Sequence, residues 1–286
     1  MTGRIIGVSQ VELHHGSATD VGLVRSANED AYLANPPVFV VADGMGGHDR
    51  GDVASGIVIE EFARLAADGY DAARGAEAIA STLQAVQDRI LAYDAEQRAN
   101  GAPASFSAGT TAVVALLVDS DDGPRWLLAN VGDSRIYRHT DGVLEQVSVD
   151  HSLVQEMVDA GQISAAAAAV HPSRNVITRA LGGSALPGSV SGEADFFLMP
   201  LAAAERLLLC SDGVSGMVSD EQIGSILGGC EDPRDAAEQL VAAALSAGGH
   251  DNATAVVVDV VGLTHTDPYD SDAQRVSLEQ KLGALP

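Results

Sequence analysis

The sequence predicts a single domain of the α+β class, and three observations support this prediction. The chain has 286 residues and is 46% hydrophobic, which is enough apolar material for one large core. Short apolar runs of strand length recur along it, and several stop at an Asp-Gly or Gly-Asp pair. Two longer stretches carry apolar residues at helical spacing. Strands and helices are therefore expected to share one core.

The central stretch is Val38–His48, which reads VFVVADGMGGH. Its first five residues have the length and β-branched content of a strand buried on both faces, and Asp43-Gly44 ends that strand. A carboxylate is thus presented at the end of a rigid element, and the following glycines let a carbonyl oxygen or a ligand come close. A lone Asp-Gly usually marks only a turn. Here the pattern of an apolar strand followed by Asp-Gly recurs at residues 207–213, and Asp251 stands shortly before another apolar run.

The remaining elements follow the same periodicities. Further strands are expected at 5–13, 112–118, 125–131, 136–139, 194–199, 206–210 and 254–261. Helices are expected at 53–65, where Asp52 is the predicted cap, and at 76–98, 153–160, 164–170, 219–227 and 233–247. The two helices between 153 and 170 interrupt a series of strands, and such insertions commonly line or cover a site. Residues 264–286 contain no motif and are expected to form a loosely held tail.

Composition excludes several classes of partner. Sixteen basic and forty acidic residues give a net charge of −24, which repels nucleic acid and anionic membranes. No apolar run approaches the about 18 residues that a membrane span needs. Cys210 and Cys230 lack metal or redox spacing and fit a reducing compartment. We therefore expect a cytoplasmic protein, monomeric, that binds neither nucleic acid nor membrane.

Acidic residues at strand ends are the candidate functional groups. Asp43, Asp212 and Asp251 each stand at a strand terminus, and Asp30 and Asp133 are candidates to lie nearby. Two carboxylates 4 Å apart repel by roughly 4 kcal/mol at an effective dielectric of about 20, so a cluster of them requires cations. Oxygen ligands favour Mg²⁺ or Mn²⁺ over zinc. Two such ions about 3.5 to 4 Å apart can share a carboxylate, lower the pKa of a water and aim it at a phosphorus atom.

The segment around Arg25 is a second candidate. Arg25 lies close to Glu29 and Asp30, which makes a compact group of one phosphate-type donor and two oxygen ligands. The alternative is a solvated turn with a local salt bridge. For Asp133, a purely structural role in a turn is an equal alternative to metal binding. The neighbouring residues His14 and His15 are expected to lie on the surface and not to bind a metal.

Other hydrolase mechanisms fail on the sequence. A cysteine phosphatase needs Arg at the sixth position after its Cys, where Gly216 and Ala236 stand. An enzyme that forms an aspartyl phosphate needs Asp two residues before Asp-Gly, where Val41 and Cys210 stand. The sequence also has no GxSxG nucleophile elbow, HExxH motif or P-loop. Water activated by metal ions is the chemistry that remains.

Eight motifs in order resemble the PPM family of metal-dependent serine/threonine protein phosphatases, type 2C, in its bacterial form. They are RSANED at 25–30, VVADGMGGH at 40–48, GTTAVVA at 109–115, NVGDSR at 130–135, DHSLVQ at 150–155, ITRALGG at 177–183, SDG at 211–213 and GHDNATAVVV at 249–258. Each is weak alone, but together they cover about residues 11–261 without a missing block. The resemblance implies a four-layer αββα sandwich, in which two central antiparallel sheets are flanked by helices. It also implies a phosphatase domain over 1–263, with a helical flap at about 151–174, and a tail over 264–286.

The resemblance also implies roles for individual residues. Asp43 would bridge two Mn²⁺ or Mg²⁺ ions, the Gly44 carbonyl would help hold one of them, and Asp212 and Asp251 would hold the other. Glu29 and Asp30 would act mainly through metal-bound waters. Arg25 matches the position that grips the substrate phosphate, and Asp133 matches a ligand of a weaker third ion.

Two positions depart from the family pattern. Met45 stands where many eukaryotic members have a His that is proposed to protonate the leaving alcohol. His48 or a metal-bound water is the candidate for that role here, and a structural role in the glycine-rich loop is the alternative for His48. Asp52 replaces a frequent Glu, and this change is expected to affect only the helix cap.

The function implied is hydrolysis of phosphoserine and phosphothreonine in proteins by direct attack of water, without a phosphoenzyme. Phosphoproteins, including bacterial Ser/Thr kinases and their targets, are the expected partners. A catalytically silent binding module is the main alternative, but it would be expected to lack metal-site aspartates, and none is missing. A regulator phosphatase acting on an anti-sigma antagonist would usually carry extra sensory domains, for which we expect no room. The acidic surface is expected to disfavour strongly acidic phosphopeptides.

Overall fold

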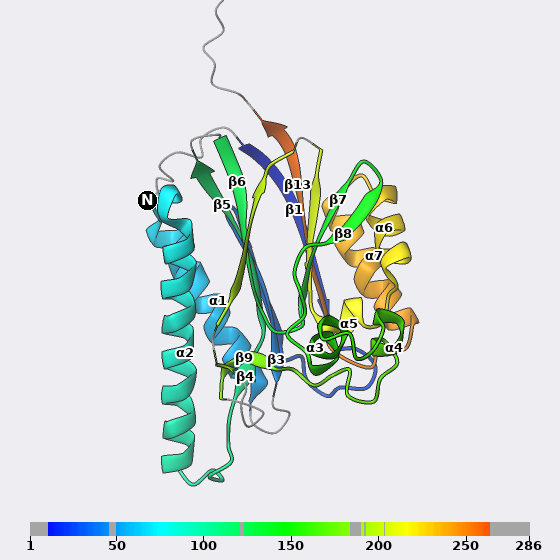
Figure 1. The fold of residues 1–286 in the computed structure, drawn as a ribbon. Helices are drawn as coiled ribbons and strands as arrows, with labels where there is room; N and C mark the ends of the chain where they lie inside the picture. The colour runs from blue at the N-terminus through cyan, green and yellow to red at the C-terminus, as the bar shows by residue number, and fades with distance from the viewer. Residues whose placement is uncertain are drawn as a thin grey trace, which may run out of the picture.

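Two β-sheets lie face to face, and helices cover the outer side of each (Figure 1). The computed structural model describes residues 11–45, 50–120, 123–183, 190–191, 193–202 and 204–263. Neighbouring strands pair antiparallel, apart from a two-residue parallel contact between β9 (Arg179–Gly182) and β10 (Val190–Ser191). The predicted four-layer αββα sandwich is confirmed.

The strands of the two sheets have the following order. The five-stranded sheet runs β1 (Val11–Asp20), β13 (Ala253–Leu263), β12 (Arg206–Cys210), β7 (Arg135–Thr140) and β8 (Val143–Gln146). The other sheet runs β10 (Val190–Ser191), β9 (Arg179–Gly182), β4 (Gly109–Thr110), β3 (Val38–Met45), β5 (Ala112–Ser120), β6 (Gly123–Val131) and β11 (Asp195–Pro200), and β2 (Asp30–Asn35) pairs with β3.

The helices form three groups. Helices α1 (Gly51–Asp68) and α2 (Gly75–Ala99) cover the sheet that contains β3, and a 3₁₀ turn, η2 (Ala72–Arg74), joins them. Helices α6 (Asp220–Gly229) and α7 (Pro233–Ser246) cover the five-stranded sheet. The short helices α3 (Leu153–Asp159), α4 (Ala165–Ala168) and α5 (Asp212–Ser215) gather at one end of the sandwich, near the end where β3 stops (Figure 1).

Strand β3 shows why its sequence is apolar without alternation. Val38, Val40 and Ala42 pack under α1 and α2, while Phe39 and Val41 face the other sheet. All five are fully buried. A strand with helices on one face and a sheet on the other must be apolar on both, as the run VFVVA predicted. The strand therefore holds the following Asp43 at the end of a rigid element.

Two local predictions were wrong. The first strand was expected at 5–13, but β1 extends from Val11 through the histidine pair to Asp20, and residues 5–10 lie outside the described chain. The alternation of apolar and polar residues in this segment is weak because β1 is an edge strand with one partly exposed face. Asp52 is not the cap of α1, which begins at Gly51, because its carboxylate instead accepts hydrogen bonds from Arg50.

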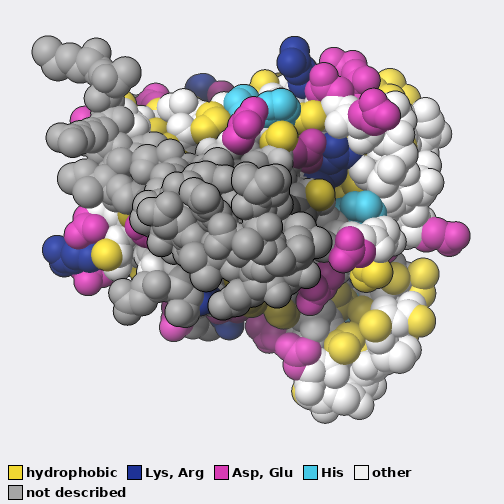
Figure 2. Space-filling model, turned by 90° about the horizontal axis from the view of Figure 1, so that it is seen from above, with side chains coloured by type: hydrophobic (Ala, Val, Ile, Leu, Met, Phe, Trp, Pro, Cys, Tyr) yellow, Lys and Arg dark blue, Asp and Glu magenta, His cyan; other side chains and the backbone are white. Residues whose placement is uncertain are grey.

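Two features of the described structure bear on the expected surface charge and on the expected absence of a membrane span. Seen from the end opposite to α3 and α4, acidic side chains are spread between hydrophobic ones, and basic side chains are fewer (Figure 2). In the part of the chain that the structure describes, no helix combines the length and the apolar character needed to cross a bilayer.

Candidate active site

The register of the strands brings the predicted carboxylates to one end of the sandwich. Asp30 and Asp43 are directly opposite one another on β2 and β3. Cys210, at the end of β12, pairs with Ala255 of β13 and with Arg135 of β7. Asp212, Asp251 and Asp133 each lie two residues beyond these strand ends, so they meet the first pair at the same end.

The backbone around Asp43 is held by the GTT motif. The hydroxyl of Thr111 accepts the Asp43 N–H at 3.0 Å, and the Asp43 carbonyl accepts from the Thr111 N–H and the Thr110 hydroxyl, both at 2.9 Å. Gly44 follows in a space with no room for a side chain. A Cβ there would lie 2.4 Å from the Gly51 carbonyl oxygen and 2.5 Å from that of Glu29. The glycine is therefore required for the close packing beside Asp43.

Asp30 is partly buried, and only one of its two carboxylate oxygens has hydrogen-bond partners. Its Oδ2 accepts hydrogen bonds from the hydroxyls of Ser211 and Thr254, both at 2.7 Å. Its Oδ1 is buried and has no hydrogen-bond partner. Burial, together with the charges of Asp212 and Asp251, raises the pKa of Asp30 to about 7 against the lowering effect of these two hydrogen bonds. An unpaired buried carboxylate oxygen indicates that a further group belongs beside it.

Asp43 and Asp212 form the centre of the cluster. Burial raises the pKa of Asp43 well above its usual range, and the charges of Asp30, Asp212, Asp133 and Asp251 add to this effect. Burial, followed by the charge of Asp251, also raises the pKa of Asp212, against a hydrogen bond with Asp43 that lowers it. A hydrogen bond between two carboxyl groups requires a proton on one of them. The cluster therefore demands positive charge, which protons or metal ions can provide.

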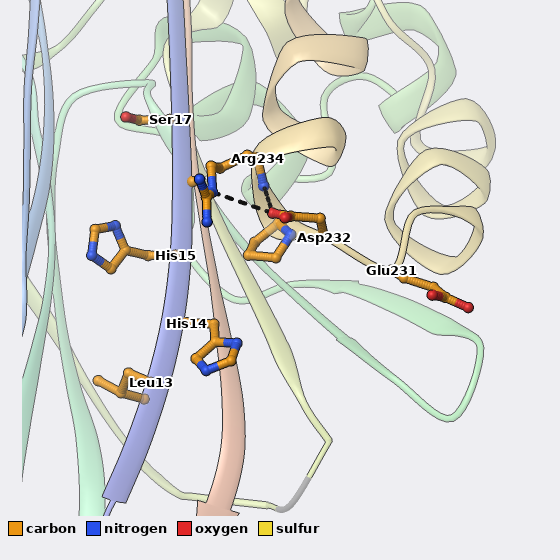
Figure 3. Close-up of a pocket in the computed structure, with 9 residues that line it drawn as sticks. Leu13, His14, His15, Ser17, Glu231, Asp232 and Arg234 are labelled. Atoms are coloured by element: carbon orange, nitrogen blue, oxygen red, sulfur yellow. Dashed lines mark hydrogen bonds and ion pairs between the residues drawn. The ribbon is translucent and has the colours of Figure 1, made fainter.

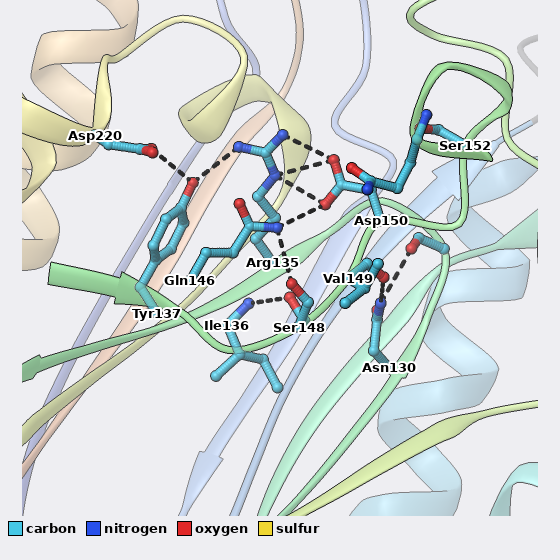
Figure 4. A network of polar contacts seen from close by, with 12 residues as sticks. Asn130, Arg135, Ile136, Tyr137, Gln146, Ser148, Val149, Asp150, Ser152 and Asp220 are labelled. Carbon is cyan, nitrogen blue, oxygen red and sulfur yellow. Dashed lines mark hydrogen bonds and ion pairs between the residues drawn. The ribbon is translucent and has the colours of Figure 1, made fainter. Parts of the chain in front are cut away.

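Asp133 lies next to a partly buried ion pair. It is 8% exposed, and its Oδ1 is buried without a partner. Burial raises the pKa of Asp133 well above its usual range, and Asp212 and Asp150 raise it further. Arg135 binds both carboxylate oxygens of Asp150, with contacts of 2.8 to 3.1 Å, and also donates to Tyr137 (Figure 4). This guanidinium lowers the pKa of both Asp133 and Asp212, so it is a fixed counter-charge beside the cluster.

Arg25 lies at the solvent side of the cluster. Its Nη2 donates to Asp251 Oδ2 at 2.7 Å, and 49% of its side chain is exposed. The hydrogen bond to Asp251 raises the pKa of Arg25, and the charges of Glu29 and Asp43 act in the same direction. Glu29 is half-buried beside this group. Burial and the charge of Asp52 raise its pKa, while Arg25 lowers it.

Four polar residues that support the site were not singled out in the sequence. Asn252 fixes the loop that carries Arg25, because its side chain accepts from the Glu29 N–H and donates to the carbonyls of Val21 and Ala27 at 2.8 to 2.9 Å. Ser211, Thr254 and Thr111 hold Asp30 and Asp43, as described above. All four are polar residues within or beside apolar strands, and this is the signal that could have identified them.

The described residues supply donors that fit a divalent ion, although they do not form a closed shell. No group of three or more His, Cys, Asp or Glu side chains in the described chain has the spacing of a ready-made metal site. The Arg25 contact occupies one carboxylate oxygen of Asp251. The oxygen chemistry of the carboxylates, their raised pKa values and the two unpaired buried oxygens nevertheless fit a hard cation. His48 lies outside the described residues, and Met45, the last residue of β3, follows Gly44.

Two surface pockets differ in how near they lie to the carboxylate cluster. The larger, of about 770 Å³, lies between β1 and the start of α7, far from the carboxylates (Figure 3). His14 and His15 project to opposite sides of β1 there, so they cannot ligate one ion together (Figure 3). The smaller, of about 420 Å³, is lined by Asp133 and Asp212 and by residues of the α3–α4 segment. Only the smaller one adjoins the candidate chemistry.

Comparisons with known proteins agree with this geometry. The family profile of Protein phosphatase 2C matches residues 24–247. The chain is 38% identical over 260 residues to serine/threonine phosphatase stp of Listeria monocytogenes, covering 86% of this chain and 96% of that protein. The crystal structure of the Mycobacterium tuberculosis serine/threonine phosphatase PstP/Ppp matches with a TM-score of 0.76 and 36% identity over 88% of this chain and 99% of that one. The PstP catalytic domain in complex with two manganese ions matches with a TM-score of 0.68 and 33% identity over 88% of this chain and 100% of that one.

Proposed function

This chain belongs to the protein phosphatase 2C (PPM) family and is a metal-dependent serine/threonine protein phosphatase, and on that premise we propose that its buried carboxylates hold the metal ions and that Arg25 receives the substrate phosphate. The family and the reaction predicted from the eight motifs are confirmed. Its substrates are phosphoproteins. The role of each site residue is our proposal.

The proposed ligands are those that the family resemblance implies. Asp43 would be shared between two ions, the Gly44 carbonyl would contribute to one of them, and Asp212 and Asp251 would hold the other. A solved neighbour that contains two manganese ions supports this number. When bound, the ions offset the carboxylate charge and lower the pKa of a water that can attack phosphorus. The all-oxygen donor set suits Mn²⁺ or Mg²⁺.

The remaining acidic residues have supporting roles in this proposal. Glu29 and Asp30 would act through water, as the resemblance implies, and hydrogen bonds from two hydroxyl groups already hold one oxygen of Asp30. Asp133, with its unpaired buried oxygen, is the ligand of a weaker third ion. His48 stays a prediction for the group that protonates the leaving alcohol.

Arg25 is suited to binding the phosphate. It uses one of its five N–H donors on Asp251, so the others are available to a phosphate dianion. Because the side chain is about half exposed, it can reach a substrate that arrives from solvent. A bidentate contact of this kind orients the phosphorus and also stabilises the charge of the transition state.

We further propose that this phosphatase opposes bacterial Ser/Thr kinases and that it is a monomeric, cytoplasmic protein. The domain is proposed to cover 1–263, with a flap at about 151–174 and a tail over 264–286. The helical segment α3–α4 lies within the proposed flap, and the tail lies outside the described residues.

The observation that carries the proposal is the position of the partly buried Asp43 among other carboxylates, where desolvation and then their charges raise its pKa. Asp43→Asn is expected to abolish Mn²⁺-dependent release of phosphate from a phosphothreonine peptide. Asp68→Asn is the matched control, because Asp68 is an exposed aspartate at the end of α1. Turnover is measured with Mn²⁺, with Mg²⁺ and with a chelator. Undiminished activity of Asp43→Asn would remove the metal assignment, and wild-type protein without turnover would favour the silent binding module.

A further inference from the structure

Two exposed apolar side chains directly precede Arg25 in the sequence. Leu23 is 70% exposed and Val24 is 65% exposed. Single apolar residues on a protein surface are common and need no explanation. Among the large apolar residues that are exposed in the described part of the chain, however, these two are the only ones that are adjacent in sequence. Their position beside the residue that is proposed to bind phosphate therefore requires a reason.

The backbone of this loop is fixed against the turn that carries Asp251. The Gly22 N–H donates to Asp20 Oδ1 at 2.8 Å, and the Leu23 N–H donates to the Gly249 carbonyl at 2.7 Å. Gly22 has a φ of 79°, which other residues rarely adopt, and a Cβ there would overlap the carbonyl oxygen of Asp251. The two apolar side chains are therefore presented to solvent by a backbone that is held in place.

A third apolar residue, Leu245 of α7, extends this exposed surface. A Cβ at Gly249 would lie 2.9 Å from Leu23 Cγ and 3.2 Å from Leu245 Cδ2, so both leucines lie close to this glycine. Leu245 is half-buried. We call Leu23, Val24 and Leu245 the apolar lip. An apolar group that covers the lip would release the water in contact with it, which is favourable.

The apolar lip lies beside the solvent-facing part of the site. Arg25 donates to Asp251 at 2.7 Å, and the loop of the lip packs on the same turn. No described residue that lines the cavity of about 420 Å³ belongs to the lip, so the two are separate. Consecutive Cα atoms are 3.8 Å apart, so the Cα of Leu23 lies within about 7.6 Å of that of Arg25. In a substrate whose phosphate is bound by Arg25, residues one or two positions from the phosphoresidue span a similar distance.

We infer that the apolar lip binds an apolar side chain of the phosphoprotein substrate, one or two residues from the phosphoresidue. The occupant is a large aliphatic or aromatic side chain, because a group of this size can cover both Leu23 and Val24. This inference rests on the proposed function, since it requires the reacting phosphate to be at Arg25. The net charge of −24 acts on substrates at long range and does not distinguish apolar from neutral polar neighbours of the phosphoresidue. Selection between such neighbours therefore depends on short-range contacts, which the lip offers.

The experiment measures steady-state kinetics of the full chain in Mn²⁺ on matched peptides. Each peptide has one phosphothreonine in an alanine background, with leucine at one of the four nearest positions. Its partner peptide has asparagine there, a polar residue of similar size. At one of these positions we expect kcat/KM to favour leucine by about tenfold, mostly through KM, because covering one such side chain typically supplies a factor of this order. An aryl phosphate, which has no flanking residues, reports on the reaction alone.

The double variant Leu23→Asn/Val24→Thr should reduce the ratio between the leucine and asparagine peptides to about one. Val143→Thr is the matched control and should keep the tenfold ratio. Val143 is 66% exposed, like Val24, but it lies at the turn between β7 and β8, at the end of β7 that is remote from Arg135 (Figure 1).

Three results would overturn the inference. One is a ratio that survives in the double variant, and another is a wild type that hydrolyses the leucine and asparagine peptides equally at all four positions. The third is an equal loss on every substrate in the double variant, the aryl phosphate included, because the two side chains would then serve only to hold Arg25. The proposed function fails separately, and the inference with it, if the wild type hydrolyses neither the peptides nor the aryl phosphate.

Discussion

Replacing Asn252 with alanine tests how the structure positions Arg25. The Asn252 side chain is 6% exposed and makes three hydrogen bonds to the backbone of residues 21–29, the loop that carries Arg25. Alanine removes all three and leaves two carbonyls and one N–H without their partners. Each neutral hydrogen bond contributes about 1 kcal/mol net, so we expect a loss of about 3 kcal/mol in the free energy of unfolding.

The loss should be visible in both stability and kinetics. A loss of about 3 kcal/mol corresponds to a decrease in Tm of about 5 to 10 °C for a chain of this size. The variant stays folded, since domains of this kind have about 5 to 15 kcal/mol of stability. Because the loop then holds Arg25 less firmly, KM for a phosphothreonine peptide should rise more than kcat falls.

The assay is thermal unfolding of the metal-free chain, together with steady-state kinetics in Mn²⁺. Asn100→Ala is the matched control, because it deletes the same amide at the exposed end of α2. If Asn252→Ala shifts Tm no more than Asn100→Ala and leaves KM unchanged, the side chain does not fix the loop, and the account of how Arg25 is positioned is wrong.

Two further predictions concern the charges of the site. Arg25→Ala should raise KM for the phosphopeptide more than it lowers kcat, because the guanidinium contributes to substrate binding as well as to the transition state. An unchanged KM, measured in steady state, counts against its role in binding phosphate. The stability of the metal-free chain should decrease as the pH rises from about 5 to 8. Burial raises the pKa of Asp30 to about 7, above its value in the unfolded chain, so the folded state binds the proton more tightly and loses that advantage as the pH passes 7. Thermal melts across this range check the direction, and a rising Tm would contradict it.

The sequence predicted the elements whose signal is local. The apolar run of β3 ending at Asp43 could be recognised because a doubly buried strand has a distinctive composition. The beginning of β1 could not be recognised in the sequence, because its residues form a strand by pairing with β13, which comes from a distant part of the chain. The same reason hid Thr254, whose hydroxyl reaches Asp30 only after the two sheets pack.

The residues of the candidate site likewise divide into those that the sequence predicted and those that it did not. The carboxylates could be chosen because an acidic residue at the end of an apolar strand stands out in the sequence. The hydrogen bonds from Asn252 to the loop that carries Arg25 could not be predicted, because they join segments more than 220 residues apart in the sequence. Sequence patterns identify groups with a local role, whereas a long-range partner is a property of the whole fold.

The origin of the carboxylates in four separate parts of the chain has a thermodynamic consequence. Asp30, Asp43, Asp212 and Asp251 come together only when both sheets have formed in register, so a proteolytic fragment that lacks either sheet would lack part of the cluster. An ion held by this cluster would bind the native chain and not the unfolded one, and mass action would then protect the protein from degradation. The abundance of the phosphatase would in this way follow the supply of divalent metal in its surroundings.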